Sequence, residues 1–422
     1  GFYNVVTATI PGADAALRGE EIAFSCHLDH PRPGANDNAS GCVTILEVAR
    51  TFAKLIREGK LAPPKRTLRF IWPPEIEGTL ALLHARPELA GRIKAVVHMD
   101  MVGGGPETKA IFHVTRGPAS LPSFVNDVAE AYGEFVNRQS AALASGGNPP
   151  YALVAPEGGK EALQADLSRL TLGSDHQIYT DSSFSIPAIY LNDWPDRYIH
   201  TNFDAPANID PTKLKRAGFI GAASAYFLAN AGVADAEALW ALVQSRSLKR
   251  TAAMLERRER LDAAEAASLT RFHFWHERAM VDSLERFFPV PDGIRHGADE
   301  FFSRLEMLTG GGSPTAAAKG EGALVFRRNP GVKGPVSVFG YDYLEDHYGR
   351  ERAEALRLPK YRGLFGSGGE YAYEALNLAD GRRTAQEIRD ALAAIYGPVP
   401  LELVVEYLKA LEEIKLVERV SP

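Results

Sequence analysis

Residues 1–231 alternate short apolar runs with helical patterns, and this alternation limits the possible fold more than any other feature. Several runs are rich in Val, Ile and Phe and lack the polar alternation of a strand with one wet face. Such strands need helices on both faces of their sheet. We therefore predict an α/β fold, a three-layer α/β/α sandwich with a mostly parallel central sheet, with strands at residues 4–10, 21–26, 67–72, 93–99, 110–114 and 187–191.

Two helices of this half are marked by spacing and by capping. Apolar residues recur three and four positions apart over residues 45–55, which places them on one helix face after Gly41. A second helix is predicted to begin at Asp210, because Asp is a good N-cap and the Pro that follows is a good first residue.

The remaining chain divides into two further parts. From about residue 235 to residue 288 the pattern is wholly helical. We predict an N-terminal domain at 1–231, a helical arm and linker at 232–334, and a small domain at 335–422. In the last, helices at 384–396 and 400–413 and a strand at 416–420 are typical of a winged-helix unit.

Composition excludes some partners. No run of about 18 apolar residues occurs, so no membrane-spanning helix and no membrane partner are predicted. The formal net charge is −6, and residues 371–422 carry six Lys/Arg against nine Asp/Glu. That balance has the wrong sign for contacts with phosphates, so we expect no nucleic-acid binding.

Cysteine content and the chain start bear on location. Only two cysteines occur, Cys26 and Cys42, which favours a reducing compartment and makes the cytoplasm the expected location. The chain begins at Gly1, directly before a predicted strand. We therefore expect that an N-terminal segment is missing from this sequence, and a signal peptide stays an alternative.

Residue types that bind metals gather in four segments that follow predicted strands. In open α/β sheets, sites form beyond the carboxyl ends of the strands. The first segment holds His27, whose ring can bind zinc, and Asp29, which could hold that ring in place. In isolation such a pair is as often purely structural.

The second and third segments supply carboxylates. The turn PGANDNASG at 33–41 places Asp37 among small residues before a helix, where a metal pair could lie close to the backbone. The alternative is an ordinary capping turn. The segment WPPEIEGT at 72–79 contains Glu75 and Glu77. One could accept a proton from water while the other binds metal, or both could face solvent at a helix start.

The fourth group combines HMDMVG at 98–103 with IHTNFD at 199–204. Asp100 and His200 are its candidate metal ligands. The string GSDH at 173–176 lies between them. His176 either contacts substrate or makes a structural hydrogen bond.

The strings HLD, PGANDNASG, HMDMVG, GSDH and IHTNFDAP, in this order, resemble the co-catalytic di-zinc aminopeptidase family, which also contains glutaminyl cyclases. The resemblance covers roughly residues 1–231. It implies the phosphorylase/hydrolase-like fold of zinc exopeptidases and two zinc ions. It also implies His27 and Asp100 on one ion, His200 and a Glu on the other, Asp37 bridging both, and Asp29 supporting His27.

One departure from the family concerns the two glutamates. The family usually has adjacent Glu residues, the first a general base and the second a ligand, whereas Ile76 separates Glu75 from Glu77 here. The order makes Glu75 the base and Glu77 the ligand. A shifted alignment would make Glu75 the ligand and leave the base unassigned.

The resemblance implies a metal-dependent hydrolase, most simply an exopeptidase that removes N-terminal residues with a zinc-activated water. One alternative is a metal amidohydrolase or glutaminyl-cyclase-like acyl transferase on a non-peptide substrate. Another is a non-catalytic scaffold that acts through the C-terminal domain. The expected partner is a small peptide or amide, and the chain could also form an oligomer.

Overall fold

The structure, a computed structural model, describes residues 4–311, 317–338, 341–363 and 366–420. Its N-terminal half is built on a seven-stranded sheet with the order β1-β3-β2-β4-β7-β5-β6. The strands β3, β2, β4 and β7 are parallel, whereas β1 and β5 each run antiparallel to their neighbours β3 and β7. The strands are β1 (Val6–Ile10), β2 (Glu21–Ser25), β3 (Thr67–Trp72), β4 (Ile93–Asp100), β5 (Phe112–Thr115), β6 (Asp166–Ser168) and β7 (Ala188–Asp193).

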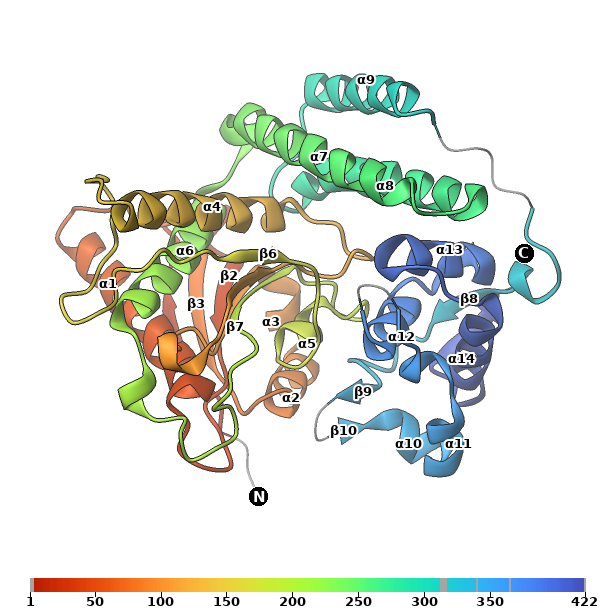
Figure 1. Ribbon diagram of the computed structural model, residues 1–422, viewed down its shortest axis with the longest axis horizontal. Coiled ribbons are helices and arrows are strands. Elements are labelled where there is room, and N and C mark those ends of the chain that lie inside the picture. The colour runs from red at the N-terminus through yellow and green to blue at the C-terminus, as the bar shows by residue number, and fades with distance from the viewer. Residues whose placement is uncertain (1–3, 312–316, 339–340, 364–365, 421–422) are drawn as a thin grey trace.

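Helices cover both faces of this sheet, as Figure 1 shows. Along β2, Phe24 packs into the core beneath one set of helices and Ala23 into the core beneath the other. The predicted three-layer α/β/α class is therefore confirmed. The first set is α1 (Gly41–Arg57), α4 (Phe124–Ala144) and α6 (Pro211–Asn230), and the second is α2 (Glu77–Ala85), α3 (Pro87–Arg92) and α5 (His176–Thr180).

Local signals place two of these helices as predicted. The predicted face of α1 is buried at Ile45, Val48 and Phe52. At the start of α6 the Asp210 side chain accepts a hydrogen bond from the N–H of Thr212.

Three long helices, α7 (Ala236–Arg258), α8 (Ala263–Asp282) and α9 (Asp292–Leu308), follow the sheet. In Figure 1, α7 and α8 extend from α4 toward the C-terminal unit, and α7 packs on α4. Their buried residues, among them Leu239 and Phe274, belong to the same core as the sheet. The predicted arm thus extends the main core, and part of the predicted linker, 312–316, lies outside the described residues.

The C-terminal unit has a hydrophobic core of its own. It contains α10 (Tyr343–Tyr348), α11 (Arg350–Ala355), α12 (Gly368–Asn377), α13 (Ala385–Tyr396) and α14 (Leu401–Glu413). A hairpin is formed by β9 (Ser337–Val338) and β10 (Tyr341–Asp342), and a three-stranded antiparallel sheet by β11 (Asp380–Thr384), β8 (Val325–Arg328) and β12 (Val417–Val420), in that order. The central strand β8 precedes the predicted boundary at 335. The winged-helix assignment stays a prediction.

In the described chain, no single helix has the length and apolar composition needed to cross a membrane. Two sharply bent helix pairs reach that composition only when taken together, Pro211–Asn230 with Val233–Arg258 and Ala385–Tyr396 with Leu401–Glu413.

Candidate metal centre

His27 stands just beyond β2, at the edge where the parallel strands end. Its ring is buried, and Nδ1–H donates to the main-chain oxygen of Asp29 at 2.9 Å. This bond turns Nε2 toward Oδ1 of Asp37 at 3.2 Å and Oδ1 of Asp100 at 3.3 Å. Burial opposes a charge on the ring, but Asp100 and Asp37 outweigh it and raise the pKa of His27. Nε2 of His27 and the two carboxylates together form a position that suits a cation.

Asp37 is held in place by a second carboxylate. The N–H groups of Asn36 and Asp37 donate to Oδ1 and Oδ2 of Asp204, at 2.6 and 2.9 Å. Asp204 lies four residues beyond His200, so its carboxylate joins the Asp37 turn to the His200 loop. Burial favours the neutral acid, yet His27 and the other nearby histidines lower the pKa of Asp37. The side chain is therefore a carboxylate at neutral pH.

The two carboxylate oxygens of Asp37 face different histidines. Oδ1 lies 3.2 Å from Nε2 of His27, and Oδ2 lies 3.1 Å from Nε2 of His200 and 3.2 Å from Nε2 of His30. Two groups of potential ligands result, one of His27, Asp37 and Asp100, the other of His30, Asp37 and His200. One oxygen in each group is the arrangement that a bridging carboxylate requires.

The spacing within both groups fits zinc. Bonds of 2.0–2.1 Å from zinc to nitrogen or oxygen place neighbouring atoms of a tetrahedral shell about 3.3–3.4 Å apart. The nitrogen–oxygen separations of 3.1–3.3 Å come close to that value. Imidazole and carboxylate are donors that zinc accepts, and an ion would replace protons that the histidines share with the carboxylates.

Four predicted ligands, His27, Asp37, Asp100 and His200, thus lie together, whereas neither group found among the described residues includes Glu77. Sequence order suggested Glu77 as a ligand, and the zinc content of Glu77→Gln would decide that role. Sequence reasoning missed His30, although the signal was present as a second imidazole three residues after His27 in the same loop.

Glu75 lies where the chain leaves β3, and two carboxylates hold the backbone there. Its N–H donates to Oδ1 of Asp29 at 2.6 Å, and the N–H of Ile76 donates to Oδ1 of the buried Asp175 at 2.7 Å. Ile76 has φ of 57°, which a β-branched residue rarely adopts, and α2 begins at Glu77. The backbone thus turns sharply between the two glutamates.

The electrostatics connect Glu75 to the ligand groups. Burial, followed by the Asp100, Asp175 and Asp37 carboxylates, raises the pKa of Glu75 to about 8, although His27 acts in the opposite direction. Its carboxyl is in neither group, but the charges of His27, Asp100 and Asp37 all affect its pKa. Asp29, predicted to support His27, does so through its main-chain oxygen, because its carboxylate lies 3.8 Å from the ring.

Two other histidines of this edge are structural. His98 is fully buried, with Nε2 2.8 Å from Oγ of Ser174. The His176 ring stacks on Tyr190 at 4.1 Å, and its Nε2–H donates to Thr171 O at 2.7 Å. Burial lowers the pKa of His176 to about 4, so the ring is neutral. These contacts favour the structural alternative for His176.

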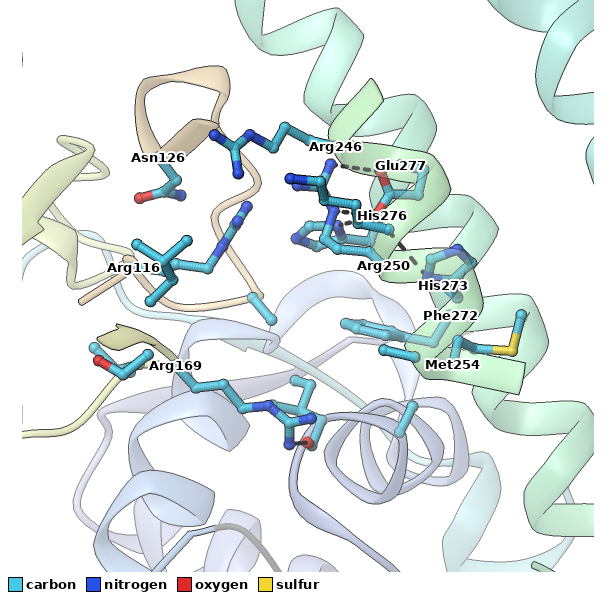
Figure 2. A pocket seen from close by; sticks show the side chains of 18 of the residues that line it. Arg116, Asn126, Arg169, Arg246, Arg250, Met254, Phe272, His273, His276 and Glu277 are labelled. Atoms are coloured by element: carbon cyan, nitrogen blue, oxygen red, sulfur yellow. Dashed lines mark hydrogen bonds and ion pairs between the residues drawn. The ribbon is translucent and has the colours of Figure 1, made fainter. Parts of the chain in front are cut away.

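A cavity of about 440 Å³ lies away from these groups, at the junction of α4, α7, α8 and α13 (Figure 2). Its wall includes Arg116, which follows β5. Thr115 of β5 pairs with Tyr190 on antiparallel β7, whereas β4, which ends at Asp100, is parallel to β7. Arg116 therefore lies toward the end of the sheet where the parallel strands begin, and Asp100 lies where they finish.

Arginine–carboxylate pairs link the helices around this cavity. Arg250 of α7 bonds Asp127 of α4 at 2.6 Å and Glu277 of α8 at 2.7 Å. Arg116 bonds Glu130 at 2.5 Å. Figure 2 shows Arg250 beside Glu277 in this network. The charges bind the helices to one another, and the candidate chemistry lies at the other end of the sheet.

Comparison with known proteins shows which family the N-terminal half matches. The profile described as Peptidase family M28 matches residues 4–225. Leucine aminopeptidase 1 of Fusarium vanettenii is 31% identical over 150 residues, which cover 30% of this chain and 36% of that protein. The protein of the same name from Sclerotinia sclerotiorum is 30% identical over 152 residues, with coverages of 31% and 37%. The matched part spans little more than a third of these relatives.

Solved structures are similar at a lower level. A zinc aminopeptidase from Bacillus subtilis has 20% identity and a TM-score of 0.39, over 53% of this chain and 49% of that one. A glutaminyl cyclase from an Acidobacteriales bacterium has 17% identity and a TM-score of 0.39, with coverages of 54% and 74%. A putative peptidase from Clostridium acetobutylicum covers 99% of this chain and 60% of its own, at 13% identity and a TM-score of 0.35.

Proposed function

The chain belongs to peptidase family M28, and from that premise we propose that it is a metal-dependent aminopeptidase acting on small peptides or amides. The observation that carries the proposal is Asp37, whose two oxygens face separate histidines. In this proposal His27 and Asp100 would hold one zinc ion, His200 would hold a second, and Asp37 would offer one carboxylate oxygen to each. Such a pair polarises the substrate carbonyl and lowers the pKa of water.

The remaining residues position and move a proton. Burial and neighbouring carboxylates raise the pKa of Glu75, and bound cations would offset them and favour its ionised form. Glu75 would then serve as the general base that takes a proton from water and passes it to the leaving amine. Hydrogen bonds from Glu75 and Ile76 to Asp29 and Asp175 hold that segment against the ligand groups. The His200 side chain is 61% exposed, so the substrate can enter from its side.

Metal analysis and one assay test this function. Protein purified without added metal is expected to carry two zinc ions per chain, as measured by elemental mass spectrometry. It is also expected to hydrolyse leucine p-nitroanilide. A chelator should abolish hydrolysis and added zinc should restore it.

Other outcomes would favour the alternatives. Bound zinc without anilide hydrolysis, but with cyclisation of an N-terminal glutaminyl peptide, would indicate an acyl transferase. A chain that binds no metal and hydrolyses nothing would indicate a scaffold acting through its C-terminal unit.

Asp29→Ala is expected to lower kcat by about 10–100-fold, the usual effect of losing an outer partner of a metal site. The substitution frees the N–H of Glu75 but keeps the main-chain oxygen that orients His27. Zinc content should therefore be unchanged while the rate falls. Loss of an ion from Asp29→Ala would show instead that the carboxylate is needed to hold His27.

A further inference from the structure

We propose that His30, and not a glutamate, completes the second metal position, which makes it a site of two imidazoles and one carboxylate. The inference rests on the proposed metal-dependent function. It departs from the ligand set that the family resemblance implies, in which a Glu accompanies His200.

His30 repeats the geometry of His27. In His27 the Nδ1–H donates to the main-chain oxygen two residues on, Asp29, at 2.9 Å, and in His30 it donates to Arg32 O at 2.5 Å. In both rings Nε2 then lies 3.2 Å from Asp37, on Oδ1 for His27 and on Oδ2 for His30. A hydrogen bond from one ring nitrogen to a carbonyl leaves the lone pair on the other, as in metal-bound histidines.

His30 and His200 approach the same oxygen from different loops. Their Nε2 atoms lie 3.2 and 3.1 Å from Oδ2 of Asp37, and their ring centres are 5.5 Å apart with planes tilted by 50°. All three ligand atoms lie within 4.8 Å of one another. The His30 side chain is 14% exposed and His200 61%, so one ligand is enclosed and the other faces solvent. An ion placed between them would have three protein donors and an open side.

The two glutamates lie outside both groups of potential ligands. Glu77 begins α2 and is in neither ligand group of the described chain. Glu75 is likewise in neither ligand group of the described chain. With two imidazoles and a single shared carboxylate, the second position should favour zinc, cobalt or nickel over magnesium and manganese, which prefer oxygen donors.

The test counts ions in three forms of the full chain. Metal-free wild type, His30→Ala and the matched control Glu77→Gln are titrated with zinc by calorimetry, and bound zinc is then measured by elemental analysis. We expect two ions in wild type and in Glu77→Gln. His30→Ala should keep one ion, with affinity for the second weakened by at least about 10²-fold, because even an outer partner of a metal site is worth about 10–100-fold.

A second variant tests whether His30→Ala loses an ion because a ligand is gone or because the chain misfolds. His30→Glu supplies a different metal-binding side chain, and we expect it to regain the second ion with a preference shifted toward manganese. Two tightly bound ions in His30→Ala, or loss of an ion from Glu77→Gln, would overturn the inference and leave the proposed function standing. A wild-type chain that binds no zinc would overturn both.

Discussion

Replacing Asp37 with alanine is expected to empty both metal positions and to lower kcat/KM by at least about 10³-fold. The two oxygens of Asp37 face His27 on one side and His30 and His200 on the other, so one substitution removes a donor from each group. Metal ions contribute several kcal/mol to such reactions, and about 1.4 kcal/mol is a factor of ten in rate. Zinc per chain and hydrolysis of leucine p-nitroanilide measure the two losses.

Asp166→Ala is the matched control for this substitution. Asp166 is an exposed aspartate that also contacts a histidine, His113, at 3.2 Å, and it lies outside both ligand groups. Its replacement should leave zinc content and rate at the wild-type level. Two ions retained in Asp37→Ala would show that Asp37 does not bridge.

Glu75→Gln is expected to lower kcat by about 10²–10⁴-fold while both ions stay bound, the usual cost of removing a general base. The reason is that Asp100 and Asp37 affect the pKa of the Glu75 carboxyl, although this carboxyl belongs to neither ligand group. The rate at saturating zinc and the zinc content, measured on the same preparation, separate loss of the base from loss of metal.

Glu77→Gln serves as the comparison, because it removes the other carboxylate of the same segment. We expect wild-type rate and zinc content from it. If Glu75→Gln instead lost an ion while Glu77→Gln behaved as wild type, Glu75 would be a ligand and the base would have to lie elsewhere.

Much of the fold could be predicted from local patterns. Continuous apolar runs predict strands covered on both faces, and β2 has that environment, with Phe24 and Ala23 in opposite cores. The reversal of β5 and the short edge strand β6 were not predictable, because the direction in which a strand joins a sheet depends on how the chain returns to it. The shared core of α7, α8 and the sheet is likewise a product of packing.

Within the candidate site, the sequence indicated which segments lie close together, but not which side-chain atoms are in contact. Parallel strands bring their carboxyl ends to one edge, which is why residues as distant as His27, Asp100 and His200 could be expected together. Sequence reasoning did not find His30, because no periodicity or spacing fixes the direction of a histidine side chain in a loop. The order of the residues in the chain suggested that Glu77 is a ligand, and that role is untested by the structure.

The sequence by itself determined the layered α/β class and the strand ends where metal-binding residue types gather, since both follow from local periodicity and residue chemistry. The tertiary structure alone decided which atoms meet. The carboxylate of Asp204 fixes the turn of Asp37 across 167 residues, and that of Asp29 fixes Glu75 across 46. Hydrogen bonds over such separations depend on the folded path of the chain, and the same path places the His30 ring beside Asp37.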